Sequence, residues 1–417
     1  MDNVPTSAFL ADMAARGSIH QCTDLEALDA ALSGGPVPAY VGFDATADSL
    51  HVGHLMSLMA LRRLQAAGHR PVVLIGGGTT KVGDPSFRDA TRPILDEEAI
   101  ARNAEALKRT VARFVRFGDG PTDAVLVDNA DWLDGLAFIG FLRDVGRHFT
   151  VSRMLTFDSV RNRIDREGGL TLLEFTYMTL QAFDFLHLSR GMGCLLQMGG
   201  SDQWGNIVNG VELARRADGR RVFGLTTPLV QTASGEKMGK TAGGAVWLDP
   251  GKLSSLDLWQ WWRNVADADV GRFLLLFTDL PVEECRRLAA GEGAALNEAK
   301  AALADAAVAI AHGREAAAAA RATATAAQGG ESAEGLPVVE IPEGEVGEGL
   351  GLVDLMIRAG FATGRGEARR AIAGGALRVD GGKADDPEGL VTRERLATGT
   401  VRLTLGRKRH ALVRMEP

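Results

Sequence analysis

The sequence is poor in cysteine and has no long apolar run. Its three cysteines, Cys22, Cys194 and Cys285, share no spacing typical of a metal site, and such an odd, sparse number is typical of free thiols in a reducing compartment. A membrane-spanning helix needs about 18 successive apolar residues, and no uncharged stretch of that length occurs. The first residues also lack the basic flank and apolar segment of a signal peptide. We therefore expect a cytoplasmic protein that does not enter a membrane.

Basic residues are missing from one stretch near the C-terminus. Residues 322–350 contain no Lys or Arg but six Glu, a Gly-Gly pair and two Pro, and this composition predicts an acidic flexible linker over residues 329–348. Beyond it, residues 351–417 hold 13 Lys or Arg against 8 Asp or Glu, although the whole chain has a net charge of −7. A polyanion would therefore have to bind where basic residues are concentrated, as they are in this tail.

Short apolar segments alternate with helical patterns in the first part of the 417-residue chain. We expect strands at residues 71–75, 124–127 and 194–198, each followed by Gly or polar residues, and helices between them, as over residues 55–67. This alternation predicts an α/β fold with a Rossmann-like, doubly wound parallel sheet, whose ligands bind at the carboxyl ends of the strands. Residues 254–328 are rich in alanine and helical in pattern, which predicts an all-helical part.

The segment 40–55 runs from a strand-like start into two histidines, His51 and His54, which flank Gly53 where a helix begins. The N-terminus of a helix favours anions, and a glycine lets a nucleotide approach closely. Two surface histidines near a helix cap would give the same pattern, so this motif alone leaves both interpretations open. No nearby Cys or acid pair has the spacing of zinc ligands, so we predict no metal site.

A second motif lies in the glycine-rich stretch 235–244, which carries Lys237, Lys240 and Thr241. Two cationic side chains on a flexible loop suit a reaction in which charge develops on a leaving pyrophosphate, although a solvated surface loop has the same composition. Together, His-Val-Gly-His followed by Lys-Met-Gly-Lys-Thr resembles the paired signatures of the class I aminoacyl-tRNA synthetases. The pair is far more specific than either motif alone.

Three polar side chains share one face of an expected helix over residues 174–185. Tyr177, Gln181 and Asp184 lie at i, i+4 and i+7, and a satisfied internal hydrogen-bond network is the other interpretation of this stripe. Three further segments carry a resemblance: Tyr-Val-Gly-Phe-Asp at 40–44, Gly-Asp-Pro-Ser at 83–86 and Gly-Gly-Ser-Asp-Gln-Trp-Gly-Asn-Ile at 199–207. With them the chain resembles the bacterial tyrosyl-tRNA synthetases over residues 4–328, and more loosely in the tail.

This resemblance implies a role for each matching residue. Two residues would hydrogen-bond the substrate phenol and four would hold its ammonium and carboxylate groups: Tyr40 and Asp184, then Asp84, Tyr177, Gln181 and Gln203. The nucleotide would be bound by Gly42, Asp44, Thr46, His51, Gly53, His54 and Asp202. The leaving pyrophosphate would meet two mobile loops, one with Lys237, Lys240 and Thr241 and the other with Arg88 and Arg92.

The basic tail has a signature of its own. Residues 365–381 read as a helix, a Gly-Gly turn and a strand, which resembles the small RNA-binding module first named in ribosomal small-subunit protein four. The basic side chains that would contact RNA phosphates are Arg365, Arg369, Arg370, Arg407, Lys408 and Arg409. A solvated basic face is the other interpretation, but after a synthetase-like core we predict that the tail binds tRNA.

The resemblance predicts a tyrosine–tRNA ligase. It would activate L-tyrosine with ATP to tyrosyl-adenylate and pyrophosphate, then transfer tyrosine to the 3′-terminal ribose of tRNA(Tyr), with Mg²⁺ held mainly by the ATP phosphates. The family is homodimeric, and residues 138–155 would form either the apolar dimer face or an internal helix. No DNA partner is expected.

Three other functions remain open from the sequence: a tryptophan-specific synthetase of the same fold, a catalytically dead synthetase-like RNA-binding protein, and a nucleotidyltransferase with the same histidine motif. The intact histidines and lysines of the two signatures argue against a dead enzyme. The predicted organisation is a Rossmann-like catalytic domain at 1–250, an α-helical domain at 251–328, the acidic linker at 329–348 and a small α+β RNA-binding domain at 349–417.

Overall fold

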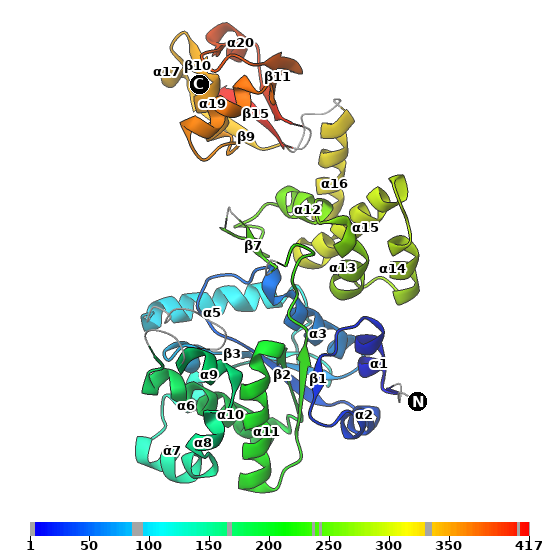
Figure 1. Cartoon of the computed structure of the whole chain (residues 1–417), viewed down its shortest axis with the longest axis vertical. Coiled ribbons are helices and arrows are strands. Elements are labelled where there is room, and N and C mark those ends of the chain that lie inside the picture. Colours follow the sequence, from blue (N-terminus) through cyan, green and yellow to red (C-terminus); the bar gives the residue numbers. More distant parts are fainter. Residues whose placement is uncertain are drawn as a thin grey trace. The chain divides into compact units, whose positions relative to one another are not determined.

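The structure is a computed structural model of the chain, and it describes residues 5–85, 95–164, 169–235, 238–241, 244–329, 336–406 and 409–416. The chain divides into two compact units, Met1–Arg314 and Glu315–Pro417, and each is described by itself. Figure 1 labels their helices and strands.

In the described part of the first unit, six strands form one sheet in the order β1-β6-β5-β2-β3-β4. Their bounds are Gln21–Cys22 (β1), Pro38–Phe43 (β2), Arg70–Ile75 (β3), Val125–Asp128 (β4), Leu196–Gly200 (β5) and Phe223–Thr227 (β6). Strands β2 to β6 are parallel, as the sequence predicted. Strand β1 pairs antiparallel with β6, and two residues are too few to leave an apolar pattern in the sequence. The chain leaves β2 toward β3 on one side and later returns to β5 on the other, so a crevice forms at the carboxyl ends of β2 and β5.

Helices connect these strands. Their bounds are Ala8–Ala15 (α1), Leu25–Ser33 (α2), Leu55–Ala66 (α3), Gly77–Thr80 (α4), Glu97–Val111 (α5), Ala130–Leu133 (α6), Phe138–Asp144 (α7), Val151–Met154 (α8), Asp158–Ile164 (α9), Leu172–Met192 (α10) and Trp204–Asp218 (α11), with single 3₁₀ turns at Val52–His54 (η1), Gly146–His148 (η2) and Ser201–Gln203 (η3). Helix α10 has both ends defined by local chemistry. The side chains of Thr171 and Glu174 cap each other's backbone N–H groups, and Gly193 ends the helix with a φ of 64°.

The alanine-rich part of the first unit is helical, as its pattern predicted. A short hairpin of β7 (Lys240–Thr241) and β8 (Gly244–Ala245) precedes α12 (Ser255–Arg263), the turn η4 (Asp267–Asp269), α13 (Val270–Phe277), α14 (Val282–Ala289) and α15 (Ala294–His312). The ring of Trp262 lies 6.0 Å from that of Phe273 and 5.5 Å from that of Phe277. These three buried aromatic side chains join α12 to α13.

The second unit contains nearly all of α16 (Arg314–Gly329), followed by an α+β module. Its described strands form a five-stranded sheet in the order β12-β11-β14-β15-β9 and a two-stranded sheet of β10 and β13. The bounds are Val338–Pro342 (β9), Glu343–Val346 (α17), Gly349–Gly351 (β10), Leu352–Arg358 (α18), Arg365–Ala373 (α19), Leu377–Val379 (β11), Gly382–Ala384 (β12), Leu390–Thr392 (β13), Arg393–Ala397 (α20), Val401–Leu405 (β14) and Arg409–Glu416 (β15). The helix, Gly-Gly turn and strand predicted over residues 365–381 are α19 and β11.

The linker predicted over residues 329–348 is wrong for its second half, and the module therefore begins before residue 349. Strand β9 pairs parallel with β15, with Val339 opposite Val413, and Ile341 is fully buried. Glutamates dominate the composition of this stretch, but an apolar residue every second position is enough for an edge strand. Residues 330–335 lie outside the described part of the chain.

No described helix has the length and apolar character needed to cross a membrane. Among the described residues, no group of three or more His, Cys, Asp or Glu side chains is arranged to hold a metal ion.

Candidate active site

A cavity of about 300 Å³ opens at the carboxyl ends of β2 and β5. Twelve of the predicted site residues line it: Tyr40, Gly42, Asp44, Thr46, Gly53, His54, Asp84, Tyr177, Gln181, Asp184, Asp202 and Gln203. They come from strands, turns and helix α10, which are far apart in the sequence. The crevice of the sheet thus brings together most of the residues that the motifs predicted, as expected for a doubly wound sheet.

One end of the cavity holds Tyr40 from β2 and Asp184 from α10, each 1 % exposed. Asn129 Nδ2 donates to Asp184 Oδ2 at 3.0 Å, and Trp132 Nε1 donates to Asp184 Oδ1 at 2.8 Å. The hydroxyl of Tyr40 is buried and has no hydrogen-bond partner among the described residues. Burial raises the pKa of the Asp184 carboxyl to about 7, against the two N–H donors, which lower it. This end is therefore prepared for one more hydroxyl group.

Asn129 and Trp132 are site residues that the sequence analysis missed. Asn129 follows strand β4, and its Oδ1 accepts from Gly78 N at 2.8 Å, so it also ties α4 to the site. The ring of Trp132 stacks on that of His187, with centroids 4.3 Å apart and planes 14° apart. A polar residue at a strand end is a signal for Asn129. Nothing local distinguishes Trp132, because its contact with Asp184 is tertiary.

The middle of the cavity is acidic and rich in amides. Gln203 Nε2 donates to Asp84 Oδ2 at 2.8 Å, and Gln181 Nε2 donates to Gln203 Oε1 at 3.4 Å. The Tyr177 hydroxyl lies 3.3 Å from both carboxylate oxygens of Asp44. Two carboxylates in one small cavity favour a cationic group, and the amides can meet a carboxylate beside it. The region therefore suits a zwitterion.

The first signature forms a compact turn at the start of α3. His51 Nδ1 accepts from Gly53 N at 3.0 Å, and His54 Nδ1 accepts from His51 N at 3.2 Å, so the two imidazole rings cap the backbone N–H groups of Gly53 and His51. A Cβ on Gly53 would lie 2.6 Å from His51 Cε1 and 3.2 Å from Met238 O. From the sequence, the close approach of a nucleotide was the expected reason for a glycine at this position. In the structure, the backbone of the second signature also lies close to Gly53.

The backbone of the first signature is hydrogen-bonded to the segment that follows the second signature. Val52 N donates to Val246 O at 2.9 Å, and Leu248 N donates to Leu50 O at 2.9 Å. Gly239 has a φ of 91°, and a Cβ there would lie 3.0 Å from Gly53 N. The described backbone thus places the second signature beside the first.

Several predicted residues of the two loops cannot be placed. Arg88, Arg92 and Lys237 lie outside the described residues, as do the side chains of Lys240 and Thr241.

The comparisons with known proteins agree with this geometry. The family model described as tRNA synthetases class I (W and Y) matches residues 32–327. The chain belongs to this family. The predicted membership of the class I synthetases is therefore confirmed.

Relatives with known names lie in the tyrosine branch of the class I family. The chain is 56 % identical over 415 residues to a tyrosine–tRNA ligase of Rhodospirillum rubrum, covering 99 % of each chain, and 56 % identical over 410 residues to one of Caulobacter sp., covering 98 % of each. A truncated mitochondrial tyrosyl-tRNA synthetase of Aspergillus nidulans matches at 30 % identity with a TM-score of 0.69, over 76 % of this chain and 93 % of that one. The predicted function, tyrosine–tRNA ligase, is confirmed, and the alternatives are not favoured.

The second unit of this class I synthetase carries a match to the S4 domain at residues 350–395. Its predicted RNA contacts have different surroundings. Arg365 pairs with Asp354 at 2.9 Å and Arg369 with Glu388 at 2.8 Å, both at exposed positions, and Arg370 is exposed on the same helix α19. Arg409 lies over the ring of Phe361 at 5.0 Å and donates to the Phe361 carbonyl at 2.8 Å. Arg407 and Lys408 lie outside the described residues.

Proposed function

We propose that the cavity at β2 and β5 binds L-tyrosine and ATP and joins them into tyrosyl-adenylate in a tyrosine–tRNA ligase. The phenol end carries this assignment, since Tyr40 has a buried hydroxyl without a described partner and both oxygens of Asp184 are held by N–H donors. A tyrosine hydroxyl there would pair with both groups. The carboxylates and amides of the middle region, with Asp84, Tyr177, Gln181 and Gln203, would then meet the α-ammonium and α-carboxylate.

The reaction needs no covalent enzyme intermediate. The tyrosine carboxylate attacks the α-phosphate of ATP, pyrophosphate leaves, and the tRNA ribose hydroxyl later takes the acyl group. The first signature with Gly42, Asp44, Thr46 and Asp202 lines the side where ATP would lie. Lys237, Lys240, Thr241, Arg88 and Arg92 would stabilise charge on the phosphates. Mg²⁺ would arrive with ATP and be held mainly by its phosphates.

The S4-like unit supplies the proposed tRNA contact. Arg369 and Arg370 lie exposed on α19, where phosphates can reach them, with Arg365 at its start. Arg409 holds Phe361 and the carbonyl beside it, so its role in RNA binding is secondary to a role in the fold. We place the enzyme in the cytoplasm, where tRNA is charged for translation.

A homodimer is proposed on an apolar surface of the first unit. The predicted segment 138–155 forms α7, η2 and α8 rather than one helix, and Phe138, Ile139 and Val151 are 69 %, 65 % and 60 % exposed. Leu172 at the start of α10 is 75 % exposed. So many large apolar side chains on the surface are typical of a protein–protein interface.

Amino-acid-dependent exchange of pyrophosphate into ATP tests the activation step. We expect exchange with tyrosine and essentially none with tryptophan or phenylalanine. Exchange with tryptophan instead, or with no amino acid at all, would contradict the assignment of the cavity.

A further inference from the structure

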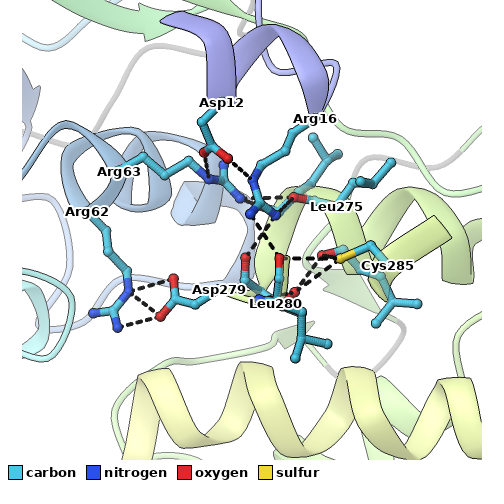
Figure 2. Close-up of polar contacts among 11 residues, drawn as sticks. Asp12, Arg16, Arg62, Arg63, Leu275, Asp279, Leu280 and Cys285 are labelled. Carbon is cyan, nitrogen blue, oxygen red and sulfur yellow. Dashed lines mark hydrogen bonds and ion pairs between the residues drawn. The ribbon is translucent and has the colours of Figure 1, made fainter. Parts of the chain in front are cut away.

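Helix α13 is held at its C-terminal end by two buried arginines from other parts of the first unit. Arg16, the residue just after α1, donates through Nη1 to Leu275 O at 3.1 Å and through Nη2 to Leu280 O at 2.9 Å. Arg63 of α3 donates through Nη2 to the carbonyls of Leu275 and Leu276, at 3.0 and 2.7 Å. The last carbonyls of a helix have no partners within it and carry its negative end, so two guanidinium groups satisfy them. Figure 2 shows this arrangement.

The arginine cluster consists of Arg16, Arg63 and Asp12. Its two guanidinium groups and one carboxylate have a net charge of about +1, which lies at the negative end of α13. Asp12 accepts from Arg16 Nε at 2.8 Å and pairs with Arg63 Nε at 3.4 Å. The side chains of both arginines are 7 % exposed. A hollow lies beside the cluster. Most of the guanidinium donors bind protein oxygens, whereas Arg63 Nη1 is buried without a partner among the described residues.

A third arginine binds Asp279, which lies two residues beyond the end of α13, at a partly exposed position. Arg62 of α3 binds Asp279 through Nε at 3.0 Å and Nη2 at 2.6 Å (Figure 2). Its Nη1 donates to Phe114 O at 3.0 Å. The pair is partly exposed, with Arg62 at 32 % and Asp279 at 50 %. Two hydrogen bonds between one guanidinium and one carboxylate define the position of Asp279 in space.

The N-terminal end of α13 holds the stem of the signature loop. Asp269, immediately before the helix, accepts from Ala233 N at 2.8 Å and from Arg272 Nη2 at 2.7 Å, and Arg272 also donates to the Gln231 carbonyl. The adjacent Val230 carbonyl accepts from Met238 N at 3.2 Å. The next residue, Gly239, is the one that packs on Gly53 of the first signature. A continuous set of contacts therefore leads from the helix to both signatures.

The two ends are joined by a short, buried helix. Its eight residues span about 12 Å at 1.5 Å per residue, and Phe273, Leu274 and Phe277 anchor it in the core. A helix of this length moves as a rigid body, so a shift at the arginine end displaces the loop stem by a similar amount.

We propose that Arg16, Arg62 and Arg63 are positioning residues for adenylate formation, which act through α13 on the stem of the signature loop. The inference rests on the proposed function of that loop, and it assigns a catalytic consequence to contacts remote from the cavity. Loss of the outer contact should misplace groups that act on the phosphates but not those that bind tyrosine.

The first test is Arg62→Ala, a partly exposed position where folding should survive. We expect the kcat of tyrosine-dependent pyrophosphate exchange to fall about tenfold while the KM for tyrosine stays within about twofold. Arg62→Lys, which keeps the charge but loses the two-pronged contact, should recover only part of the rate. Arg287→Ala is the matched control, because Arg287 forms a similar exposed pair with Glu284 at 2.7 Å within α14.

The second test asks whether the contacts at the two ends of α13 affect the rate of adenylate formation through the same structural element. Arg272→Ala removes a loop-stem contact, and its rate loss should not multiply with that of Arg62→Ala in the double variant. Wild-type exchange, measured beside them, tests the function itself. An Arg62→Ala protein with a lowered melting temperature but wild-type kcat, like the control, would overturn the proposal, and so would fully multiplicative losses.

Discussion

At the scale of single residues, the phenol end of the cavity combines a hydroxyl without a described partner and a carboxylate whose two oxygens each accept one hydrogen bond. Tyr40 is buried without a described hydrogen bond, whereas Asn129 and Trp132 hold the two oxygens of Asp184. A buried polar group without a partner costs free energy of folding, and a bound ligand can remove that cost. The structure thus gives up stability where substrate specificity is needed.

Tyr40→Phe should separate stability from binding. The free energy of unfolding of the ligand-free protein should rise or stay level, by about 0 to 1 kcal/mol, because the lost hydroxyl has no described partner. The KM for tyrosine should rise about tenfold, as a hydrogen bond to the substrate is lost. Denaturant titration and pyrophosphate exchange measure the two effects. A clear loss of stability would show that the hydroxyl is already bonded within the protein.

The affinity for tyrosine should depend on pH. Burial raises the pKa of Asp184 to about 7, so its ionised form becomes common only as the pH rises through that value. In the proposed site the ionised carboxylate would accept a hydrogen bond from the tyrosine hydroxyl, and we therefore expect tighter binding at about pH 8 than at about pH 6, by up to about tenfold. Phenylalanine should show no such trend. Equilibrium binding of both amino acids to the wild type and to Asp184→Asn gives the comparison, and parallel pH profiles for the two ligands would contradict it.

At the scale of elements, the first signature pairs with the segment that follows the second signature and touches the second signature itself. Hydrogen bonds join Val52 to Val246 and Leu50 to Leu248, and Gly239 of the second signature lies against Gly53. Their closeness requires glycine on both sides, which explains two positions of the motifs without reference to the nucleotide. The loop is therefore positioned by the first signature as well as by α13.

Gly239→Ala and Gly235→Ala make a matched pair. Both glycines have a positive φ, 91° and 82°, so an alanine at either carries similar backbone strain. Only at Gly239 would the new Cβ press on the first signature, 3.0 Å from Gly53 N, whereas nothing lies within 4 Å at Gly235. We expect kcat for exchange to fall at least about tenfold more in Gly239→Ala. Equal losses would mean that strain alone matters at these sites.

At the scale of the whole molecule, each unit has a core of its own. Leu355, Met356, Ile372, Leu403 and Val413 are buried within the second unit, and β9 completes its sheet. A chain cut near residue 349 would remove most of that core and leave β9 without its neighbour. A truncation that tests the function of this module without leaving an unpaired β9 behind must therefore end before residue 336.

A chain ending after residue 329 should form tyrosyl-adenylate at close to the wild-type rate. Its charging of tRNA should fall by at least about 100-fold, because the basic S4-like unit, which we propose binds the tRNA phosphates, is missing. Pyrophosphate exchange and aminoacylation at matched salt measure the two steps. Undiminished aminoacylation would show that the tail is not the tRNA anchor, and lost exchange would show that the first unit depends on the second.

Local patterns of the sequence by themselves determined the parallel sheet and the helical part, and the motifs with their family resemblance marked twelve of the residues that line the cavity. Strand ends, glycines and the two signatures are written in short segments, and a doubly wound sheet brings strand ends to one edge. Composition failed at residues 338–342, where pairing with β15 decides that a glutamate-rich stretch becomes a strand. Only the tertiary structure placed Trp132 on Asp184 and the arginines on α13, because such contacts join residues whose separation in the sequence carries no periodicity.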